Sequence, residues 1–143
     1  MKEKIFETDF WLIKLNSNDQ HNLGRSVVVL KRECHHLSEI TKEEILDLYK
    51  IIKKLESALK NAFGATMFNW TCLMNNAYKK DNDEKPQVHL HFRPRYENKV
   101  EFEGKIFEDT DFAHHYKNGT KRIVSEDLAE KIIEKIVEEL NKK

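Results

Sequence analysis

The stretch that decides the fold is residues 87–96, QVHLHFRPRY. Its odd positions up to Arg95 are Gln, His, His, Arg and Arg, whereas the even positions before Pro94 are Val, Leu and Phe. This two-residue period is typical of a β-strand with one apolar and one polar face. We therefore expect the Val, Leu and Phe side chains to be buried, and the Gln and both His side chains to line one cleft.

Two imidazoles and two guanidinium groups on one strand face favour an anionic ligand. A neutral imidazole can attack phosphorus as a nucleophile, and positive charge stabilises the phosphoryl oxygens in the transition state. We therefore take His89 and His91 as candidate catalytic residues, and Arg93 and Arg95 as candidate substrate-binding residues. The alternative is a solvated strand face with two incidental histidines.

The rest of the chain predicts more strands and two helices. Strands are expected at residues 10–15, 26–30 and 68–74 and in a hairpin at residues 100–107, and the β-branched run at 26–30 predicts burial on both faces. Helices are expected after Thr41, which opens a capping box, and after the N-cap Ser125. This order predicts one α+β domain, residues 1–143, with an antiparallel sheet of about five strands, a long central helix and a C-terminal helix.

Composition limits the classes of partner. The 143 residues suit a single core, and 25 basic residues balance 25 acidic residues, so the charge indicates neither nucleic acid nor membrane. No apolar run approaches the roughly 20 residues of a membrane span. The first residues, MKEKIFE, lack the apolar region of a secretory signal. We therefore expect a cytoplasmic protein.

Residues 87–96 resemble the signature of the histidine triad (HIT) family of nucleotide hydrolases and transferases. That signature is His-x-His-x-His with apolar residues between, often followed closely by Pro-Arg. Residues 23–32 (LGRSVVVLKR) resemble the family's glycine, hydrophobic strand and Lys-Arg, and residues 37–41 (LSEIT) resemble the approach to its main helix. The resemblance extends over residues 10–96 and implies a HIT-like fold.

The resemblance also implies roles for the residues of the strand. His89 matches the family's nucleophile, which forms a covalent nucleotidyl-histidine intermediate, and His91 matches the histidine that contacts the substrate phosphate. Gln87 replaces the first triad histidine and is expected among the substrate-binding residues. In the family, the second nitrogen of the nucleophile bonds a backbone carbonyl near this position, and a glutamine need not remove that bond.

Further expectations rest on looser alignment with the family. Asn75 or Asn76 is expected to hold a phosphate oxygen or the leaving group, and Asn16 and Gln20 lie where family members contact the nucleoside. The implied substrate is a purine nucleotide, either a dinucleoside polyphosphate such as diadenosine tetraphosphate or a nucleoside phosphoramidate. A homodimer is implied as well, and Mg²⁺ can accompany a polyphosphate.

We expect no structural zinc. Some HIT relatives bind zinc through a CxxC pair, the histidine after Lys-Arg and the first triad histidine. This chain has no CxxC pair, and Glu33 and Gln87 occupy the other two positions. No cofactor is therefore expected to be required.

Two other functions stay open at this point. His89 and His91 followed by Glu97 resemble a cupin-like metal site, although a cupin is nearly all strand. A nucleotide-binding protein that has the fold without the catalysis is the other alternative. His114 and His115 lie outside the common signature, and they are either neighbours of the site or surface residues.

Overall fold

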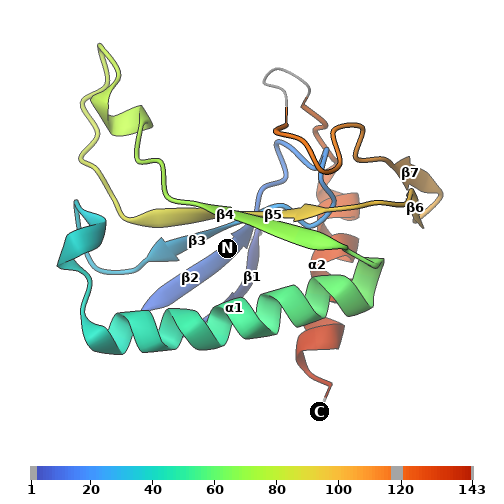
Figure 1. The fold of residues 1–143 in the computed structure, drawn as a ribbon, viewed down its shortest axis with the longest axis horizontal. Helices are drawn as coiled ribbons and strands as arrows, with labels where there is room; N and C mark the ends of the chain where they lie inside the picture. Colours follow the sequence, from blue (N-terminus) through green and yellow to red (C-terminus); the bar gives the residue numbers. More distant parts are fainter. Residues whose placement is uncertain (1–2, 117–120, 143) are drawn as a thin grey trace.

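The computed structural model describes residues 3–116 and 121–142 and has the predicted α+β architecture. A five-stranded antiparallel sheet forms its centre, with the strand order β1-β2-β3-β5-β4 (Figure 1). The strands are β1 (Lys4–Glu7), β2 (Trp11–Leu15), β3 (Ser26–Leu30), β4 (Met67–Thr71) and β5 (His89–Arg95). The sequence analysis missed β1, because four residues with one buried side chain carry too little periodicity. The predicted hairpin, β6 (Val100–Phe102) and β7 (Lys105–Phe107), forms a separate two-stranded sheet.

The two faces of the main sheet have different environments. On β2 and β3 every second side chain is buried and the others are half-buried, so the prediction that the strand at 26–30 is buried on both faces is wrong. β3 pairs with β5 so that Val27 lies opposite His91 and Val29 lies opposite His89. Because paired residues point to the same face, Val27 and Val29 share the histidine face, and the alternate residues of β3 enter the core.

Helix α1 (Lys42–Phe63) covers the core face of the sheet (Figure 1). Its predicted ends are confirmed, because Thr41 and Glu44 form a capping box and Gly64 ends the helix with a φ of 77°. Trp11 on β2 is fully buried, and its indole Nε1 donates a hydrogen bond of 2.9 Å to the carbonyl oxygen of Glu44. The helix side chains that enter the core are mainly Leu48, Ile51, Leu55, Leu59 and Phe63.

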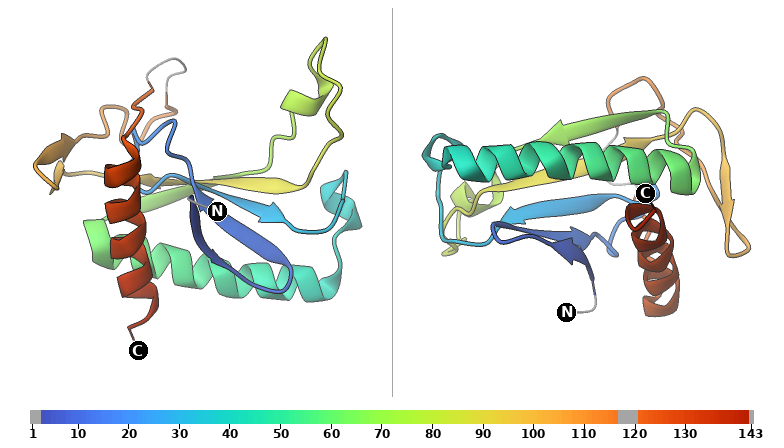
Figure 2. Two further views of the ribbon diagram at one scale, coloured as in Figure 1. Left: turned by 180° about the vertical axis from the view of Figure 1, so that it is seen from behind. Right: turned by 90° about the horizontal axis from the view of Figure 1, so that it is seen from below.

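Helix α2 (Glu126–Leu140) crosses one end of the sheet and packs against α1 and β1 (Figure 2). Ser125 caps it as predicted, since its side chain accepts a hydrogen bond of 3.1 Å from the backbone N–H of Leu128. Ala129, Ile132 and Ile136 are buried. Within residues 3–116 and 121–142, no helix has the length and apolarity needed to cross a membrane.

A buried ion pair anchors the segment that follows β7. The Arg95 Nε on β5 lies 2.7 Å from Asp109 Oδ2, and both side chains are almost completely buried. Burial alone would raise the pKa of the Asp109 carboxyl, but hydrogen bonds from Arg95 and from the backbone of Tyr96 outweigh it, so that this pKa is lowered. Arg95 also donates to the carbonyl oxygen of Asp111. Residues 109–116 are therefore held over one end of the histidine face.

Replacing Asp109 by Asn should destabilise the fold strongly. The change leaves the Arg95 guanidinium buried without a countercharge, for which we expect a loss of about 3–5 kcal/mol in the free energy of unfolding. Urea unfolding followed by circular dichroism measures this loss. The matched control is Glu108→Gln, which removes an exposed pair with Lys99 at 3.9 Å and should cost less than about 1 kcal/mol. Equal, small losses in both variants would contradict an anchoring role.

Candidate active site

The alternation predicted for residues 87–96 is present in β5. Val88 and Phe92 are fully buried and Leu90 is half-buried. His89 and His91 lie side by side on the opposite face, with ring centroids 5.0 Å apart and an interplanar angle of 83°. Both are half-buried, so that each ring is supported by its neighbours and still borders solvent.

A backbone carbonyl sets the tautomer of His89. The Nδ1 atom of its ring lies 2.8 Å from the carbonyl oxygen of Gln87. A carbonyl only accepts hydrogen bonds, so Nδ1 carries the proton, and the lone pair of the neutral ring is on Nε2. This is the arrangement that a nucleophilic imidazole requires.

His91 is held in its neutral form. Burial lowers its pKa to about 4, and the nearby His89, Arg25 and Arg93 lower it in the same direction. At neutral pH the ring therefore has one N–H to donate and carries no charge. A neutral donor next to the nucleophile can bind a phosphoryl oxygen without competing for a proton.

The side chain of Gln87 is bonded to backbone groups of the fold, and its predicted substrate contact stays a prediction. Its side-chain amide donates hydrogen bonds of 2.7 Å to the carbonyl oxygens of Leu30 and Arg32, and its Oε1 accepts one of 3.2 Å from the backbone N–H of Cys34. The amide thus clamps the chain leaving β3 to the start of β5. Because the same residue presents its carbonyl to His89, the clamp also positions that ring.

The side chains of Arg95 and Gln20 also make hydrogen bonds within the fold. Arg95 is 1% exposed, and its hydrogen bonds to Asp109, Asn69 and the Asp111 carbonyl use four of its five N–H groups. Gln20 is fully buried, and its carboxamide bonds only backbone atoms in the loop between β2 and β3. Most hydrogen-bonding groups of both side chains are thus used within the fold, while Arg95 also borders a surface groove; substrate contacts by Arg95 and Gln20 stay predictions.

Arg93 differs from Arg95 because the described residues give it no carboxylate partner. It is 8% exposed, and its one described hydrogen bond joins Nη1 to Asn22 Oδ1 at 3.3 Å. Its Nε is buried and finds no partner within the described part of the chain. The ring of Tyr116 covers the guanidinium, with its centroid 3.3 Å from Cζ. The side chain is thus a buried, unpaired cation two residues along the strand from His91.

The asparagines of the sequence analysis lie at opposite ends of the sheet. Asn16 is half-buried at the start of the β2–β3 loop, and its backbone N–H bonds the carbonyl oxygen of Arg25 at 2.9 Å. Asn75 and Asn76 are exposed at the base of the loop after β4, which projects away from the sheet (Figure 1). Substrate contacts by these three residues stay predictions.

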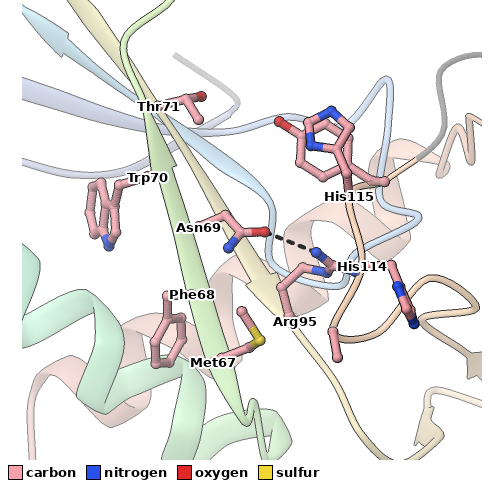
Figure 3. Close-up of a pocket in the computed structure, with 10 residues that line it drawn as sticks. Met67, Phe68, Asn69, Trp70, Thr71, Arg95, His114 and His115 are labelled. Carbon is pink, nitrogen blue, oxygen red and sulfur yellow. Dashed lines mark hydrogen bonds between the residues drawn. The ribbon is translucent and has the colours of Figure 1, made fainter.

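A groove of about 520 Å³ lies between β4 and the chain segment after β7. Asn69 and Thr71 on β4 form one side and His114 and His115 the other (Figure 3). Thr71 pairs with His91 and Asn69 pairs with Arg93, so the groove adjoins the site. His114 and His115 are therefore neighbours of the site. The period-two pattern of residues 67–71 places its alternate residues on one face, but the sequence carries no signal for the register that brings them beside β5.

Comparison with known proteins decides the family. The family model of the HIT domain matches residues 2–98. The chain belongs to the HIT family. No curated protein matches it in sequence.

Solved structures share the HIT fold at low identity. A histidine triad protein from Sinorhizobium meliloti 1021 has a TM-score of 0.72 and 20% identity, with 94% of this chain and 87% of that chain covered. One from Marinobacter aquaeolei VT8 has a TM-score of 0.71 and 19% identity, with coverage of 96% and 89%. Diadenosine triphosphate hydrolase from Plasmodium falciparum, in complex with Cyclomarin A, has a TM-score of 0.67 and 18% identity, with coverage of 98% and 77%.

The family assignment removes the cupin alternative. The two helices and the five-stranded sheet are those of the HIT fold. Glu97 follows β5, is exposed, and donates its backbone N–H to Thr66 Oγ1 at 3.1 Å. The Glu97 carboxylate, which a cupin-like metal site would require, is therefore not positioned by the strand that carries the histidines.

The lowered pKa of His91 predicts a pH-dependent stability. In the unfolded chain His91 has its ordinary pKa of 6.5, whereas in the fold the pKa is about 4. Between these values the unfolded state binds a proton that the native state does not, so stability falls as the pH falls through this window. Urea unfolding at about pH 7 and about pH 5 should show a smaller acid loss in His91→Gln than in the wild type. The control His36→Gln, at an exposed position, should keep the wild-type loss. An unchanged loss in His91→Gln would contradict a depressed pKa.

Proposed function

We propose that this HIT protein cleaves nucleotide derivatives at the α-phosphate, with His89 as the nucleophile. The observation that carries the proposal is the 2.8 Å hydrogen bond between His89 Nδ1 and the Gln87 carbonyl oxygen. It places the reactive lone pair on Nε2 although a glutamine replaces the first triad histidine. The departure from the signature therefore leaves the requirement for nucleophilic catalysis satisfied.

The reaction proceeds in two displacements. First, the Nε2 lone pair forms a bond to the α-phosphorus, and the bond from phosphorus to the leaving group breaks with its electron pair on the leaving group. An amine leaving group takes up a proton from solvent as it departs. Second, water attacks the nucleotidyl-histidine and loses a proton to solvent, the N–P bond breaks with its electron pair on Nε2, and a nucleoside monophosphate is released. His89 then has its Nε2 lone pair again.

The neighbouring groups stabilise the charge that develops on the phosphoryl oxygens. The neutral His91 donates one N–H to a non-bridging oxygen, and the nearby Arg25 and Arg93 add positive charge from the same end of the site. Arg25 is itself paired with Asp19. The geometry thus combines a nucleophile, a donor and a positive field on one strand face.

The substrates we propose are purine dinucleoside polyphosphates, such as diadenosine tetraphosphate, or purine nucleoside phosphoramidates. A polyphosphate would bring Mg²⁺ with it, whereas the nucleophile itself requires no metal. Support comes from the family, and from the structural neighbour that is named a diadenosine triphosphate hydrolase. The nucleoside is proposed to lie near Asn16, and the protein is proposed to act in the cytoplasm.

Replacing His89 by Ala should abolish turnover and leave the fold intact. The lost ring lies on the polar face, so little core packing changes, while kcat should fall by on the order of a thousandfold or more. The measurement is nucleoside monophosphate released from adenosine 5′-phosphoramidate and from diadenosine tetraphosphate. Intact-mass spectrometry of wild-type protein quenched in alkaline denaturant, which preserves the acid-labile N–P bond, should show one nucleotidyl adduct, which His89→Ala lacks. His36→Ala is the matched control and should retain activity.

Two outcomes would overturn this assignment. Substantial turnover by well-folded His89→Ala would move the nucleophile elsewhere. Tight nucleotide binding by the wild type, without release of product or a trapped adduct, would show a nucleotide-binding protein without catalysis.

We propose that the protein is a homodimer joined along β4 and one flank of α1. β4 is an edge strand that pairs only with β5 within the described sheet, and exposed edges favour pairing. Ile45, Tyr49 and Ile52 form a stripe at helical spacing on α1, and the first two are more than half exposed. The stripe continues to Glu56, whose carboxylate accepts a hydrogen bond of 2.8 Å from Trp70 on β4. The apolar flank and the open edge therefore adjoin.

Sedimentation analysis of two helix variants tests this dimer. The double substitution Ile45→Glu with Tyr49→Glu places charge in the stripe and should give a monomer. Leu46→Glu is the matched control, because Leu46 is 61% exposed on another side of α1 and should keep the dimer. A wild type that sediments as a monomer at micromolar concentration would contradict the proposed interface.

A further inference from the structure

The buried guanidinium of Arg93 lowers the stability of the fold. A buried cation loses its hydration, and proteins usually compensate that loss with a carboxylate and a full set of hydrogen bonds. The two arginines nearby each have a carboxylate partner, since Arg25 pairs with Asp19 and Arg95 pairs with Asp109, although the Nε of Arg25 is also buried without a hydrogen-bond partner among the described residues. Arg93 has no carboxylate within ion-pair distance in the part of the chain that the structure describes, and its buried Nε has no partner there. The carboxylate that acts on Arg93 from a distance, Asp19, is already paired with Arg25, so Arg93 has no ion-pair partner of its own among the described residues.

The segment after β7 holds this charge in place. Arg95 fixes the segment through Asp109 and the Asp111 carbonyl, and five residues later Tyr116 stacks on Arg93. His115 stacks in turn on Tyr116, with centroids 4.6 Å apart and an interplanar angle of 21°. A cation over a tyrosine ring is stabilised without being neutralised. The stack therefore screens the guanidinium from water and preserves its charge.

Arg93 follows His91 along β5 and lies opposite a residue of β4 that lines the groove. His91 and Arg93 are alternate residues of β5 and share a face, and Asn69, the partner of Arg93 across the strands, lines the groove. Arg93 also acts electrostatically on His91, whose pKa it helps to lower. An anion bound beside His91 would supply the countercharge that the fold does not.

We propose that Arg93, held by Tyr116, forms a second phosphate subsite next to His91, and that the preferred substrate is therefore a polyphosphate chain rather than a phosphoramidate. This inference rests on the proposed function of His89. A phosphoramidate presents one phosphate, which the histidines bind, whereas a dinucleoside polyphosphate brings further negative charge to the unpaired guanidinium. Arg93 contacts the substrate, and Tyr116 is a positioning residue.

Kinetics with two substrates separate this role from general support of the site. Arg93→Met should lower kcat/KM for diadenosine tetraphosphate about tenfold to a hundredfold more than it lowers kcat/KM for adenosine 5′-phosphoramidate. Tyr116→Leu should act in the same direction, and Tyr116→Phe, which keeps the ring, should resemble the wild type. Arg93→Met should also be at least as stable as the wild type, since it removes an unpaired buried charge. Equal losses on both substrates, no loss, or a strong fall in melting temperature would overturn the proposal.

A binding measurement makes the test independent of turnover. Titration calorimetry with inorganic pyrophosphate should show binding to the wild type and to Tyr116→Phe, and about tenfold or weaker binding to Arg93→Met. Equal affinity in all of these proteins, or no binding to the wild type, would overturn the subsite. A wild type that binds pyrophosphate through Arg93 but cleaves neither nucleotide would refute the function proposed for His89 and leave the subsite standing.

Discussion

The antiparallel pairing of β5 between β3 and β4 is the constraint on which the rest of the molecule depends. The strand period of two divides β5 into a core face and a histidine face, and the register with its neighbours then decides what each side chain meets. Val27 and Val29 lie next to the histidines on the same face of the sheet, while Trp70 packs on Phe92 on the core face. A slip of one residue would bury the imidazoles and expose Phe92. The apolar core under α1 therefore stabilises the register that assembles the site.

Several polar side chains near the site form hydrogen bonds to backbone groups, and burial is the reason. A buried amide or guanidinium must find hydrogen-bond partners, and backbone carbonyls are the nearest acceptors. Gln87 meets this need by joining the chain after β3 to the start of β5, and Gln20 does so within the β2–β3 loop. The clamp at Gln87 lies where some HIT relatives have a zinc ligand. Hydrogen bonds of one side chain can thus fix the carbonyl that orients His89.

Arg93 and Arg95 show how the same residue type serves different ends two positions apart. Arg95 is neutralised by Asp109 and fixes the segment that carries Tyr116, whereas Arg93 has the aromatic ring and one long hydrogen bond. An unpaired buried charge lowers stability, and a protein retains such a cost most readily where function needs the charge. The Arg95–Asp109 ion pair thus holds the segment whose Tyr116 covers Arg93. The Arg93 guanidinium in turn places positive charge beside His91 and the proposed nucleophile His89.

The sequence by itself determined both helices, every strand of the main sheet except β1, and the strand that carries the candidate site. The capping box at Thr41, Gly64 and Ser125 mark helix ends because these signals are local, and the alternation of residues 87–96 separates core from site because strand geometry has a period of two. The role of Gln87, Gln20 and Arg95, and the presence of Tyr116 at the site, came only from the tertiary structure. Those roles depend on which distant backbone or carboxylate lies within hydrogen-bond reach, and that distance is set by strand register and loop path. Local sequence encodes which groups can bond, and the packed fold decides the partner that each one finds.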